Sequence, residues 1–363
     1  MSSGNGGIDR LIRRDLQGLK AYQPIEPPEI LGERAGISEV IKLDGNENPY
    51  GCSPGVGRAL ADYPRYHIYP DPEQREARKA LSAYVGIDPK HIVAGAGSDE
   101  LIDLILRLFI EPGDEVINCS PTFGMYPFCT EVCGGSVADV PRDSSYAVDI
   151  SKIKQALNQR TKVIFIASPN NPSGNLTPES AILELVETGR VVVIDEAYYE
   201  FSGATVSPRA TEHDNLIVLR SLSKWAGLAG LRIGYGIFPA AVAEKLLTIK
   251  QPYNINLAAQ VALLESLADI DYLQGTVEKI LSERERLFKE LSALDSLKPF
   301  PTQSNFILCE VTTGDAKAIH DSLQKKGIFI RYFDSPRLEN SLRISVGRPE
   351  HTDALIAALK EIC

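Results

Sequence analysis

Four short segments are so continuously apolar that each predicts a β-strand buried on both faces. They are "KVIFIASP" (162–169), "VVVIDEA" (191–197), "LIVLRS" (216–221) and "RIGYGIF" (232–238). Such strands occur mainly in parallel sheets, because the helices that connect them cover both faces of the sheet. A helical pattern at residues 177–189, which begins with Thr177 and Pro178, separates the first two segments. The sequence therefore predicts an α/β fold with a mostly parallel sheet flanked by helices.

The chain before this sheet contains further helical patterns and one more strand. The helical patterns cover residues 8–20, 74–84 and 98–110. The first eight residues, "MSSGNGGI", are small and polar and predict a loose arm, and residues 21–30 are proline-rich and predict an extended segment. Residues 92–97 (IVAGAG) predict a strand that ends in a glycine loop. Ser98 and Asp99 are candidate N-caps of the helix that follows.

The pattern changes after about residue 250. A long helical stretch at 257–293 is followed by alternating β-rich and helical segments. These segments are residues 305–311, 315–326, 327–333, 341–347 and 351–361. We therefore expect a large domain at residues 46–254, a smaller α+β domain at 255–363, and an N-terminal segment at 1–45 that joins the smaller domain. A chain of 363 residues is long enough for about two domains.

Charge and cysteine content narrow the possible partners and surroundings. The formal net charge is −10 without a long run of Lys or Arg, which argues against binding to nucleic acid or an anionic membrane. The sequence lacks both an N-terminal signal core and an apolar run of the ~18 residues that span a membrane. Six cysteines are scattered without zinc-ligand spacing, and we expect Cys129 and Cys133 to be packed thiols rather than metal ligands. The composition predicts a reduced, cytoplasmic protein that binds no metal.

Polar side chains follow each of the predicted strands at the point where the strand ends. They are Ser98 and Asp99, then Asn170 and Asn171, then Asp195, Glu196 and Tyr198, and finally Ser221, Ser223 and Lys224. Ligands of open α/β sheets bind at the carboxyl ends of the strands. We therefore expect these side chains to converge on one site.

Two of these residues are hard to explain as ordinary surface groups. Asp195 follows four apolar residues, so its carboxylate is desolvated unless a cation pairs with it in a structural salt bridge. Lys224 follows a buried strand, and apolar surroundings would lower its pKa for Schiff-base chemistry, unless the side chain reaches solvent. The motif "GAGSDE" (95–100) lacks the third glycine of a dinucleotide-binding loop, which disfavours a NAD-binding protein. A glycine loop at a helix N-terminus suits a phosphate, although a plain helix cap explains it equally well.

Pyridoxal phosphate would engage all of these groups, since it offers an aldehyde, a pyridinium nitrogen, a phenolic oxygen and a phosphate. The motifs "SPNNPSG" (168–174), "VVVIDEAYYEF" (191–201) and "SLSKWAGLAGLRIG" (221–234) resemble those of the fold-type-I, class I/II aminotransferases. Four more are similar to the histidinol-phosphate branch of that family: "LDGNENPYG" (43–51), "YPDP" (69–72), "GAGSDE" (95–100) and "SPTFGMY" (120–126). The likeness runs from about residue 22 to the C-terminus in the expected order. It implies the fold-type-I pyridoxal-phosphate transferase architecture.

The resemblance assigns roles in cofactor binding to individual residues. It implies that Lys224 forms an internal aldimine with pyridoxal phosphate and later moves the substrate's proton. Asp195 would keep the ring nitrogen protonated, while Asn171 and Tyr198 would bind the phenolic oxygen. Phe123 would stack on the ring, at a position where many relatives carry tyrosine. The residues implied around the phosphate are Ser98, Asp99, Ser221, Ser223 and Arg232. Tyr69 would reach the phosphate bound by a second subunit, which implies a homodimer.

The resemblance also implies the substrates. Arg331 and Arg343, each of which would otherwise be a normal surface arginine, would hold the phosphate of histidinol phosphate and, in the other half-reaction, the carboxylates of glutamate. Tyr22 would add a phosphate contact. The expected reaction is transamination of histidinol phosphate with 2-oxoglutarate, giving imidazole acetol phosphate and glutamate, in histidine biosynthesis. Arg348 departs from the small polar residue common in relatives, and would either alter substrate preference or face solvent.

Several other functions remain compatible with the same motifs. An aminotransferase for aromatic or other amino acids would keep every cofactor residue, and so would a phosphothreonine-type decarboxylase. A non-catalytic regulator on this fold is disfavoured, because residues 1–40 are too short and insufficiently basic for a DNA-binding domain. The sequence alone does not separate the two enzyme alternatives from the histidinol-phosphate activity.

Overall fold

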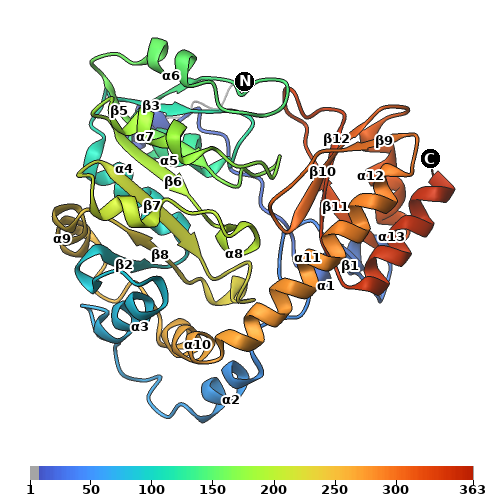
Figure 1. Cartoon of the computed structure of the whole chain (residues 1–363), viewed down its shortest axis with the longest axis horizontal. Coiled ribbons are helices and arrows are strands. Elements are labelled where there is room, and N and C mark those ends of the chain that lie inside the picture. The colour runs from blue at the N-terminus through green and yellow to red at the C-terminus, as the bar shows by residue number, and fades with distance from the viewer. Residues whose placement is uncertain (1–7, 363) are drawn as a thin grey trace.

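The structure, a computed structural model, describes residues 8–362 and contains two β-sheets in that part of the chain (Figure 1). The loose arm predicted for residues 1–8 lies outside the described residues except for Ile8, and so does Cys363. The two sheets lie side by side, and the long helix α11 (Ile270–Ser292) runs from the larger sheet towards the smaller one. The predicted domain boundaries after residues 45 and 254 stay a prediction.

The larger sheet has seven strands among the described residues. Their spatial order is β2 (Ile92–Gly95), β8 (Gly234–Ile237), β7 (Leu216–Ser221), β6 (Val191–Asp195), β5 (Thr161–Ala167), β3 (Glu115–Asn118) and β4 (Ser136–Asp139). Strand β8 is antiparallel to both of its neighbours, and all other neighbouring pairs are parallel. The mostly parallel sheet predicted from the apolar segments is therefore confirmed. The carboxyl ends of β2, β5, β6 and β7 consequently lie at one edge of the sheet.

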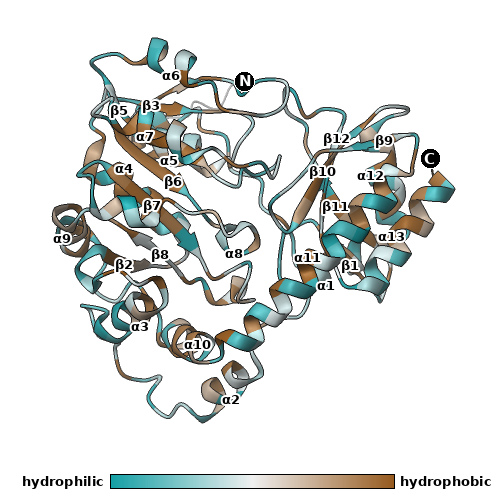
Figure 2. Ribbon diagram, viewed as in Figure 1, coloured by the Kyte–Doolittle hydropathy of each residue, from teal (hydrophilic) through white to brown (hydrophobic). Residues whose placement is uncertain are grey.

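Helices cover both faces of this sheet, because successive side chains of its strands point to opposite faces. One face packs on α4 (Ser98–Phe109), α5 (Met125–Val132) and α9 (Ala240–Ile249) through side chains such as Val193. The other face, which includes Ile194, packs on α3 (Arg75–Val85), α6 (Ile150–Ala156), α7 (Glu179–Val186) and α10 (Leu257–Ala268). Figure 2 shows the apolar strands β5, β6 and β7 between helices whose outer surfaces are hydrophilic.

The smaller sheet combines strands from both ends of the chain. Its order is β1 (Ile41–Leu43), β11 (Ile328–Tyr332), β12 (Ser341–Ser345), β10 (Phe306–Val311) and β9 (Leu297–Pro299). Strand β1 is parallel to β11, and the other pairs are antiparallel. The remaining helices are α1 (Pro28–Ala35), α2 (Pro54–Asp62), α8 (Tyr199–Ser202), α12 (Ala316–Lys325) and α13 (Pro349–Ile362). None of the helices within residues 8–362 is both long and apolar enough to cross a bilayer.

Three local predictions were wrong at helix boundaries. Residues 8–20 form only two short 3-10 turns, which bury no residue, and a short helix without a buried face is unstable in water. Helix α4 begins at Ser98, with Gly97 at the N-cap position, so Ser98 and Asp99 lie in the first turn and are not caps. Helix α7 begins at Glu179 after Pro178, and the backbone amide of Thr177 donates to the Ser168 hydroxyl instead of starting the helix.

Candidate active site

A cavity of about 390 Å³ lies at the edge of the larger sheet where the parallel strands end. It is lined by most of the residues that the sequence singled out for cofactor and substrate binding. These are Tyr22, Ser98, Asp99, Phe123, Asn171, Asp195, Tyr198, Ser221, Ser223, Lys224, Arg232 and Arg343. Arg343 belongs to β12 of the smaller sheet, so side chains from both sheets face this cavity. The strand ends therefore converge on the cavity as predicted, except that Asn170 and Glu196 do not line it.

Lys224 reaches the cavity from the turn that follows β7. Its Nζ donates a hydrogen bond to the carbonyl oxygen of Gly45 at 3.0 Å. Burial, reinforced by the nearby Arg343 cation, lowers the pKa of Lys224 from 10.5 to about 8. Near neutral pH a substantial fraction of this amine is therefore unprotonated, which is the form that acts as a nucleophile.

Asp195, the last residue of β6, is a buried carboxylate without a cation. The hydroxyl of Tyr126 donates to its Oδ2 at 2.7 Å, and the backbone amide of Ala197 donates to its Oδ1 at 3.0 Å. Within residues 8–362 it makes no ion pair, and burial raises its pKa to about 6. The alternative of a structural salt bridge therefore does not apply to Asp195.

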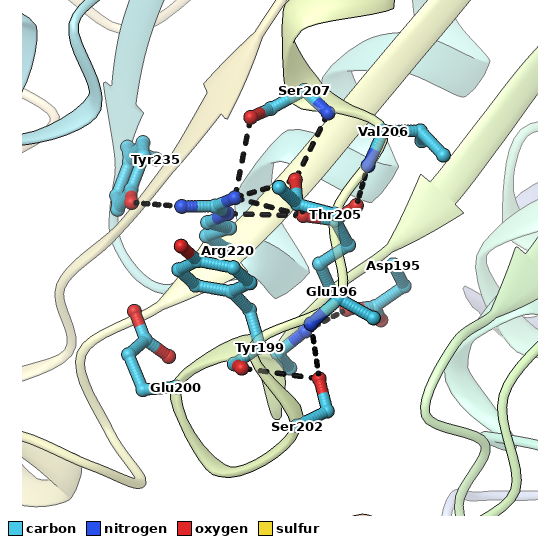
Figure 3. Close-up of polar contacts among 12 residues, drawn as sticks. Asp195, Glu196, Tyr199, Glu200, Ser202, Thr205, Val206, Ser207, Arg220 and Tyr235 are labelled. Atoms are coloured by element: carbon cyan, nitrogen blue, oxygen red, sulfur yellow. Dashed lines mark hydrogen bonds and ion pairs between the residues drawn. The ribbon is translucent and has the colours of Figure 1, made fainter. Parts of the chain in front are cut away.

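The structural salt bridge lies one residue further along the chain. Glu196 Oε2 accepts hydrogen bonds from Arg220 Nη2 at 3.0 Å and from the Thr205 hydroxyl at 2.7 Å (Figure 3). The side chains of Glu196 and Arg220 are only 2% and 3% exposed, so the pair is almost fully withdrawn from water. The guanidinium also lies over the Tyr199 ring, 3.5 Å from its centroid. This cluster is satisfied by its own members and lies outside the cavity lining.

Asn171 and Tyr198 line the cavity, and both are held by neighbouring side chains. The Oδ1 of Asn171 accepts a hydrogen bond from Arg343 Nη1 at 2.6 Å. The hydroxyl oxygen of Tyr198 accepts one from Asn46 Nδ2 at 2.9 Å, and burial raises the pKa of this phenol to about 12. Tyr198 therefore stays protonated at neutral pH and can donate its own proton. Asn171 retains its amide hydrogens as donors.

Arg343 is a buried guanidinium without a carboxylate partner among the described residues. Its Nη2 donates to the carbonyl oxygen of Asp44, and its Nε has no hydrogen-bond partner in the described part of the chain. Burial lowers the pKa of Arg343 from its ordinary value, and its hydrogen bonds go to an amide and a carbonyl oxygen rather than to a carboxylate. A buried cation in this state is stabilised by any anion that enters the cavity.

The loop before α4 forms a narrow cradle at the other end of the cavity. Gly97 has a φ of +78°, and a Cβ there would lie 2.6 Å from Nη2 of Arg232. A Cβ on Gly234 would lie 2.6 Å from the backbone nitrogen of Ser98. Arg232 also pairs with Asp99 at 2.7 Å, and Ser221 and Ser223 line the same cavity. Helix-terminal amides, hydroxyl groups and a guanidinium together suit a phosphate.

Besides Asn170 and Glu196, three candidate residues lie outside the cavity lining. Tyr69 is 77% exposed and stacks on Tyr253 at a centroid distance of 4.4 Å. The Nη2 of Arg331 donates to the carbonyl of Gln23 at 3.1 Å, next to Tyr22 in the chain. Arg348 is exposed and its Nε donates to the carbonyl of Pro49. Arg331 thus contacts the segment that covers the cavity rather than the cavity itself.

Tyr126 and Asn46, which bind the Asp195 carboxylate and the Tyr198 hydroxyl, were not predicted as site residues. Both residues fall inside motifs that carried the family resemblance, "SPTFGMY" and "LDGNENPYG". Membership of those motifs was the available signal, because nothing local in the sequence indicates contacts 69 and 152 residues away.

The two cysteines four residues apart pack as thiols on and beside α5. Cys129 is buried, and its burial raises the pKa of the thiol to about 12. The Sγ of Cys133 lies 4.0 Å from Oδ1 of Asp103. No group of three or more potential metal ligands occurs within residues 8–362.

Comparisons with known proteins agree with this geometry. The sequence profile of class I and II aminotransferases matches residues 38–359. Histidinol-phosphate aminotransferase of Dehalococcoides mccartyi is 50% identical over 355 residues, which cover 98% of each chain. That of Roseiflexus castenholzii is 47% identical over 366 residues, covering 98% of this chain and 99% of its own.

A solved structure gives the same result. The crystal structure of histidinol-phosphate aminotransferase from Sinorhizobium meliloti in complex with pyridoxal-5'-phosphate has a TM-score of 0.87 and 29% identity, covering 96% of each chain. Aspartate aminotransferase from Thermus thermophilus shares the fold at a TM-score of 0.81 and 21% identity. These similarities confirm the resemblance and the fold class that the motifs predicted.

Proposed function

Because the chain belongs to the class I and II aminotransferases, we propose that it exchanges an amino group between histidinol phosphate and 2-oxoglutarate in histidine biosynthesis, with pyridoxal phosphate as cofactor. The observation that carries this proposal is that one cavity is lined by a buried carboxylate, Asp195, and a buried guanidinium, Arg343, neither of which makes an ion pair within residues 8–362. A ligand that satisfies both presents a cationic group to Asp195 and an anionic group to Arg343. The protonated ring nitrogen of the cofactor is such a cation, and the substrates named above supply the anion.

The residues of the cavity complement the cofactor group by group. When bound, pyridoxal phosphate supplies an aldehyde that reacts with primary amines and a protonated ring that accepts electrons. Asp195 holds the proton on the ring nitrogen, because a buried carboxylate gains strongly from a charge-assisted hydrogen bond. Asn171 and Tyr198 would donate hydrogen bonds to the phenolic oxygen, and Phe123, which also lines the cavity, would contact the ring. The cradle residues that hold the phosphate are Ser98, Asp99, Ser221, Ser223 and Arg232.

Lys224 performs the proton transfer. Its Nζ lies in the cavity with a pKa of about 8, so the amine is able both to attack the cofactor's aldehyde and to accept a proton. With the cofactor and substrate bound, Nζ would be the group positioned to take the proton from the substrate's α-carbon and to hold it before its return. The carbonyl of Gly45, 3.0 Å away, holds Nζ in place between these steps.

The arginines select the substrate. Histidinol phosphate has no carboxylate, so its phosphate is the anion that Arg343 and Arg331 bind, with Tyr22 as a further contact. Glutamate places a carboxylate in the same position. Arg331 is held by the carbonyl of Gln23 and can release it when an anion arrives, since a neutral carbonyl is the weaker partner.

The proposal includes a homodimer in which Tyr69 completes the partner's phosphate site. Its support is the exposure of Tyr69, together with three neighbouring exposed residues, Tyr66, Ile68 and Tyr253. The proposal also keeps the division at residues 1–45, 46–254 and 255–363, supported by the two separate sheets, and a cytoplasmic location, supported by five free cysteine thiols.

A comparison of amino donors on one preparation of the holoenzyme tests the substrate. Histidinol phosphate should give the highest kcat/KM, and dephosphorylated histidinol should react poorly. If phenylalanine or tyrosine reacts faster than histidinol phosphate, the chain is an aromatic aminotransferase instead. Release of carbon dioxide from phosphothreonine would identify the decarboxylase alternative.

A further inference from the structure

Asn46 is a buried residue in a strained conformation beside the proposed cofactor site. Its φ is +54°, which is rare for a residue with a side chain, and it is only 1% exposed. Backbone strain of this kind persists where the surroundings fix it, and it concentrates at functional sites. Asn46 lines the same cavity as Lys224 and Asp195.

The backbone N–H, the backbone carbonyl and the side-chain amide of Asn46 all make hydrogen bonds. Its backbone N–H donates to the Ser345 hydroxyl oxygen at 2.8 Å, and that hydroxyl donates to Asn46 Oδ1 at 2.9 Å. Its carbonyl accepts a bond from Asn305 Nδ2 at 2.9 Å. Because Ser345 occupies Oδ1, the amide nitrogen is the part of the side chain that faces Tyr198, to which it donates at 2.9 Å.

The direction of the hydrogen bond between Asn46 and Tyr198 determines where the hydroxyl proton of Tyr198 points. The Tyr198 oxygen accepts from Asn46, so its own hydroxyl proton points away from Asn46. Tyr198 is buried and lines the cavity, which makes the cavity the remaining direction for that proton. Accepting one hydrogen bond also makes a hydroxyl a stronger donor in the next.

The same contacts join Tyr198 to the strand that carries the substrate arginine. Ser345 and Arg343 are two residues apart on β12, so their side chains lie on one face of the smaller sheet. Arg343 binds Asn171, and Ser345 orients Asn46, which binds Tyr198. Strand β12 therefore contacts Asn171 directly and is linked to Tyr198 through Asn46.

We propose that Asn46 is a positioning residue that fixes the Tyr198 hydroxyl as a donor into the cavity and thereby lowers the proton affinity of the bound cofactor. This inference rests on the proposed function. A donor bond to the phenolic oxygen stabilises its anionic form, so losing the orientation of that donor makes the cofactor hold its proton more tightly. The effect appears without any substrate present.

The test is a pH titration of the visible absorbance of the bound cofactor in the holoenzyme. Asn46→Ala should raise the pH midpoint by about half to one pH unit, a three- to tenfold change in proton affinity, as for one neutral hydrogen bond. Tyr198→Phe should raise it at least as much. In the Tyr198→Phe background, Asn46→Ala should add no further shift, because Asn46 acts through the Tyr198 hydroxyl.

Asn48→Ala is the matched control in the same motif. Asn48 is buried and binds the Trp225 carbonyl and the Thr276 hydroxyl, not Tyr198, so this variant should lose thermal stability without moving the midpoint. If Asn46→Ala does not fold, Ser345→Ala removes the anchor of the amide and should move the midpoint the same way by a smaller amount. An unchanged midpoint in both variants, or an equal shift with and without the Tyr198 hydroxyl, overturns the inference. A wild type that binds no pyridoxal phosphate would instead overturn the proposed function.

Discussion

Asp195 and Glu196 are neighbours at the end of the same strand, yet their carboxylates lie in opposite environments. Asp195 faces the cavity and is bound by a phenol and a backbone amide. Glu196 points to the other side, where Arg220, Thr205 and the backbone amide of Val206 bind it (Figure 3). The alternation of side chains along a strand is the reason for the separation.

The difference shows how to distinguish a structural buried charge from a functional one. Glu196 has its counterion inside the protein, so the folded chain already compensates the cost of its burial. Asp195 and Arg343 have no counterion among residues 8–362, and both face the cavity. A charge of the second kind is stabilised only when a ligand arrives. The two kinds should therefore respond differently to substitution: the cavity charges should affect turnover, and the paired charges should affect stability.

The largest expected effect separates a partly buried lysine, Lys224, from a buried one, Lys250. Lys224→Ala should reduce turnover by several orders of magnitude without lowering thermal stability, because it removes the proton-transferring amine and a desolvated cation. Borohydride should fix the cofactor to Lys224 in the wild type and not in the variant. Both measurements use the purified holoenzyme, and an adduct mapped to another lysine would refute the assignment.

Lys250 is the matched control for that experiment. It is buried, and its Nζ donates to three backbone carbonyls, those of Pro72, Gln251 and Pro252. Lys250→Met should therefore lower the free energy of unfolding by about 1–3 kcal/mol, the cost of unsatisfied buried carbonyls, and leave turnover of the folded enzyme within about tenfold. If Lys250→Met lost as much turnover as Lys224→Ala, the distinction between a functional and a structural lysine would be wrong.

The next effect concerns the cavity carboxylate. Asp195→Asn preserves the shape and the bond from Tyr126 but removes the charge that keeps the ring nitrogen protonated. A loss of about 4 kcal/mol of transition-state stabilisation corresponds to about a thousandfold decrease in kcat. Single-turnover kinetics with histidinol phosphate measure it. A variant that keeps most of its activity would place Asp195 with Glu196 as a structural carboxylate.

On the opposite side of the sheet, stability should change instead. Arg220→Met leaves Glu196 buried without a cation, which should cost about 3–5 kcal/mol in the free energy of unfolding. Denaturant unfolding measures this loss, and the rate per folded molecule should stay within about tenfold. The double variant Arg220→Met, Glu196→Gln should be more stable than Arg220→Met alone, because no unpaired charge remains. If the double variant is less stable, the pair does not act as a charge pair.

How much the sequence could predict follows from the same contrast. The strands were predictable because uninterrupted apolar runs such as residues 191–194 have few alternatives to a buried sheet. Lys224 and Asp195 were predictable as functional residues because a charged side chain directly after a buried strand loses hydration, which is unfavourable unless the charge is paired or used. Asn46 and Arg220 were not, because their roles depend on contacts with Tyr198 and Glu196 that only the folded chain creates. The caps expected at Ser98 and Asp99 and the helix start expected at Thr177 were wrong, since a polar residue near a helix start is not always the one that caps it.

A smaller effect of Asp195 should appear in the free energy of unfolding of the cofactor-free protein. There the carboxylate is unfavourable, whereas it favours turnover in the holoenzyme. Burial raises the pKa of Asp195 from 3.8 to about 6. Below pH 4 the carboxyl is protonated in both the folded and the unfolded chain and costs nothing. Between pH 4 and 6 only the unfolded chain ionises, so Asp195 lowers stability progressively, by about 3 kcal/mol at pH 6 and above.

Asp195→Asn should therefore stabilise the cofactor-free protein above pH 6 and leave it unchanged below pH 4. The difference between the two proteins in urea unfolding at pH 4, 5, 6 and 7 measures this gain, and titrations shared by both proteins cancel. Adding pyridoxal phosphate should abolish or reverse the gain, because the bound ring nitrogen compensates the carboxylate. A gain that does not vary with pH would come from packing rather than from the charge.

The smallest effect compares two arginines that lie opposite each other on the paired strands β11 and β12. Arg343 is buried, lines the cavity and has no carboxylate partner in the described chain, whereas Arg331 is partly exposed and binds the Gln23 carbonyl. Charge-assisted bonds of about 1.5–3 kcal/mol predict a decrease in kcat/KM for histidinol phosphate of about a hundredfold for Arg343→Gln and about tenfold for Arg331→Gln. Both variants should also weaken glutamate, while histidinol, which lacks the phosphate, should be nearly indifferent to Arg331→Gln. An equal loss with histidinol would mean that Arg331 acts by holding the segment around Tyr22 and Gln23 in place. Arg331 would then have a structural role, as Arg220 does. Arg343 alone would be the cation that binds the anionic group of the substrate.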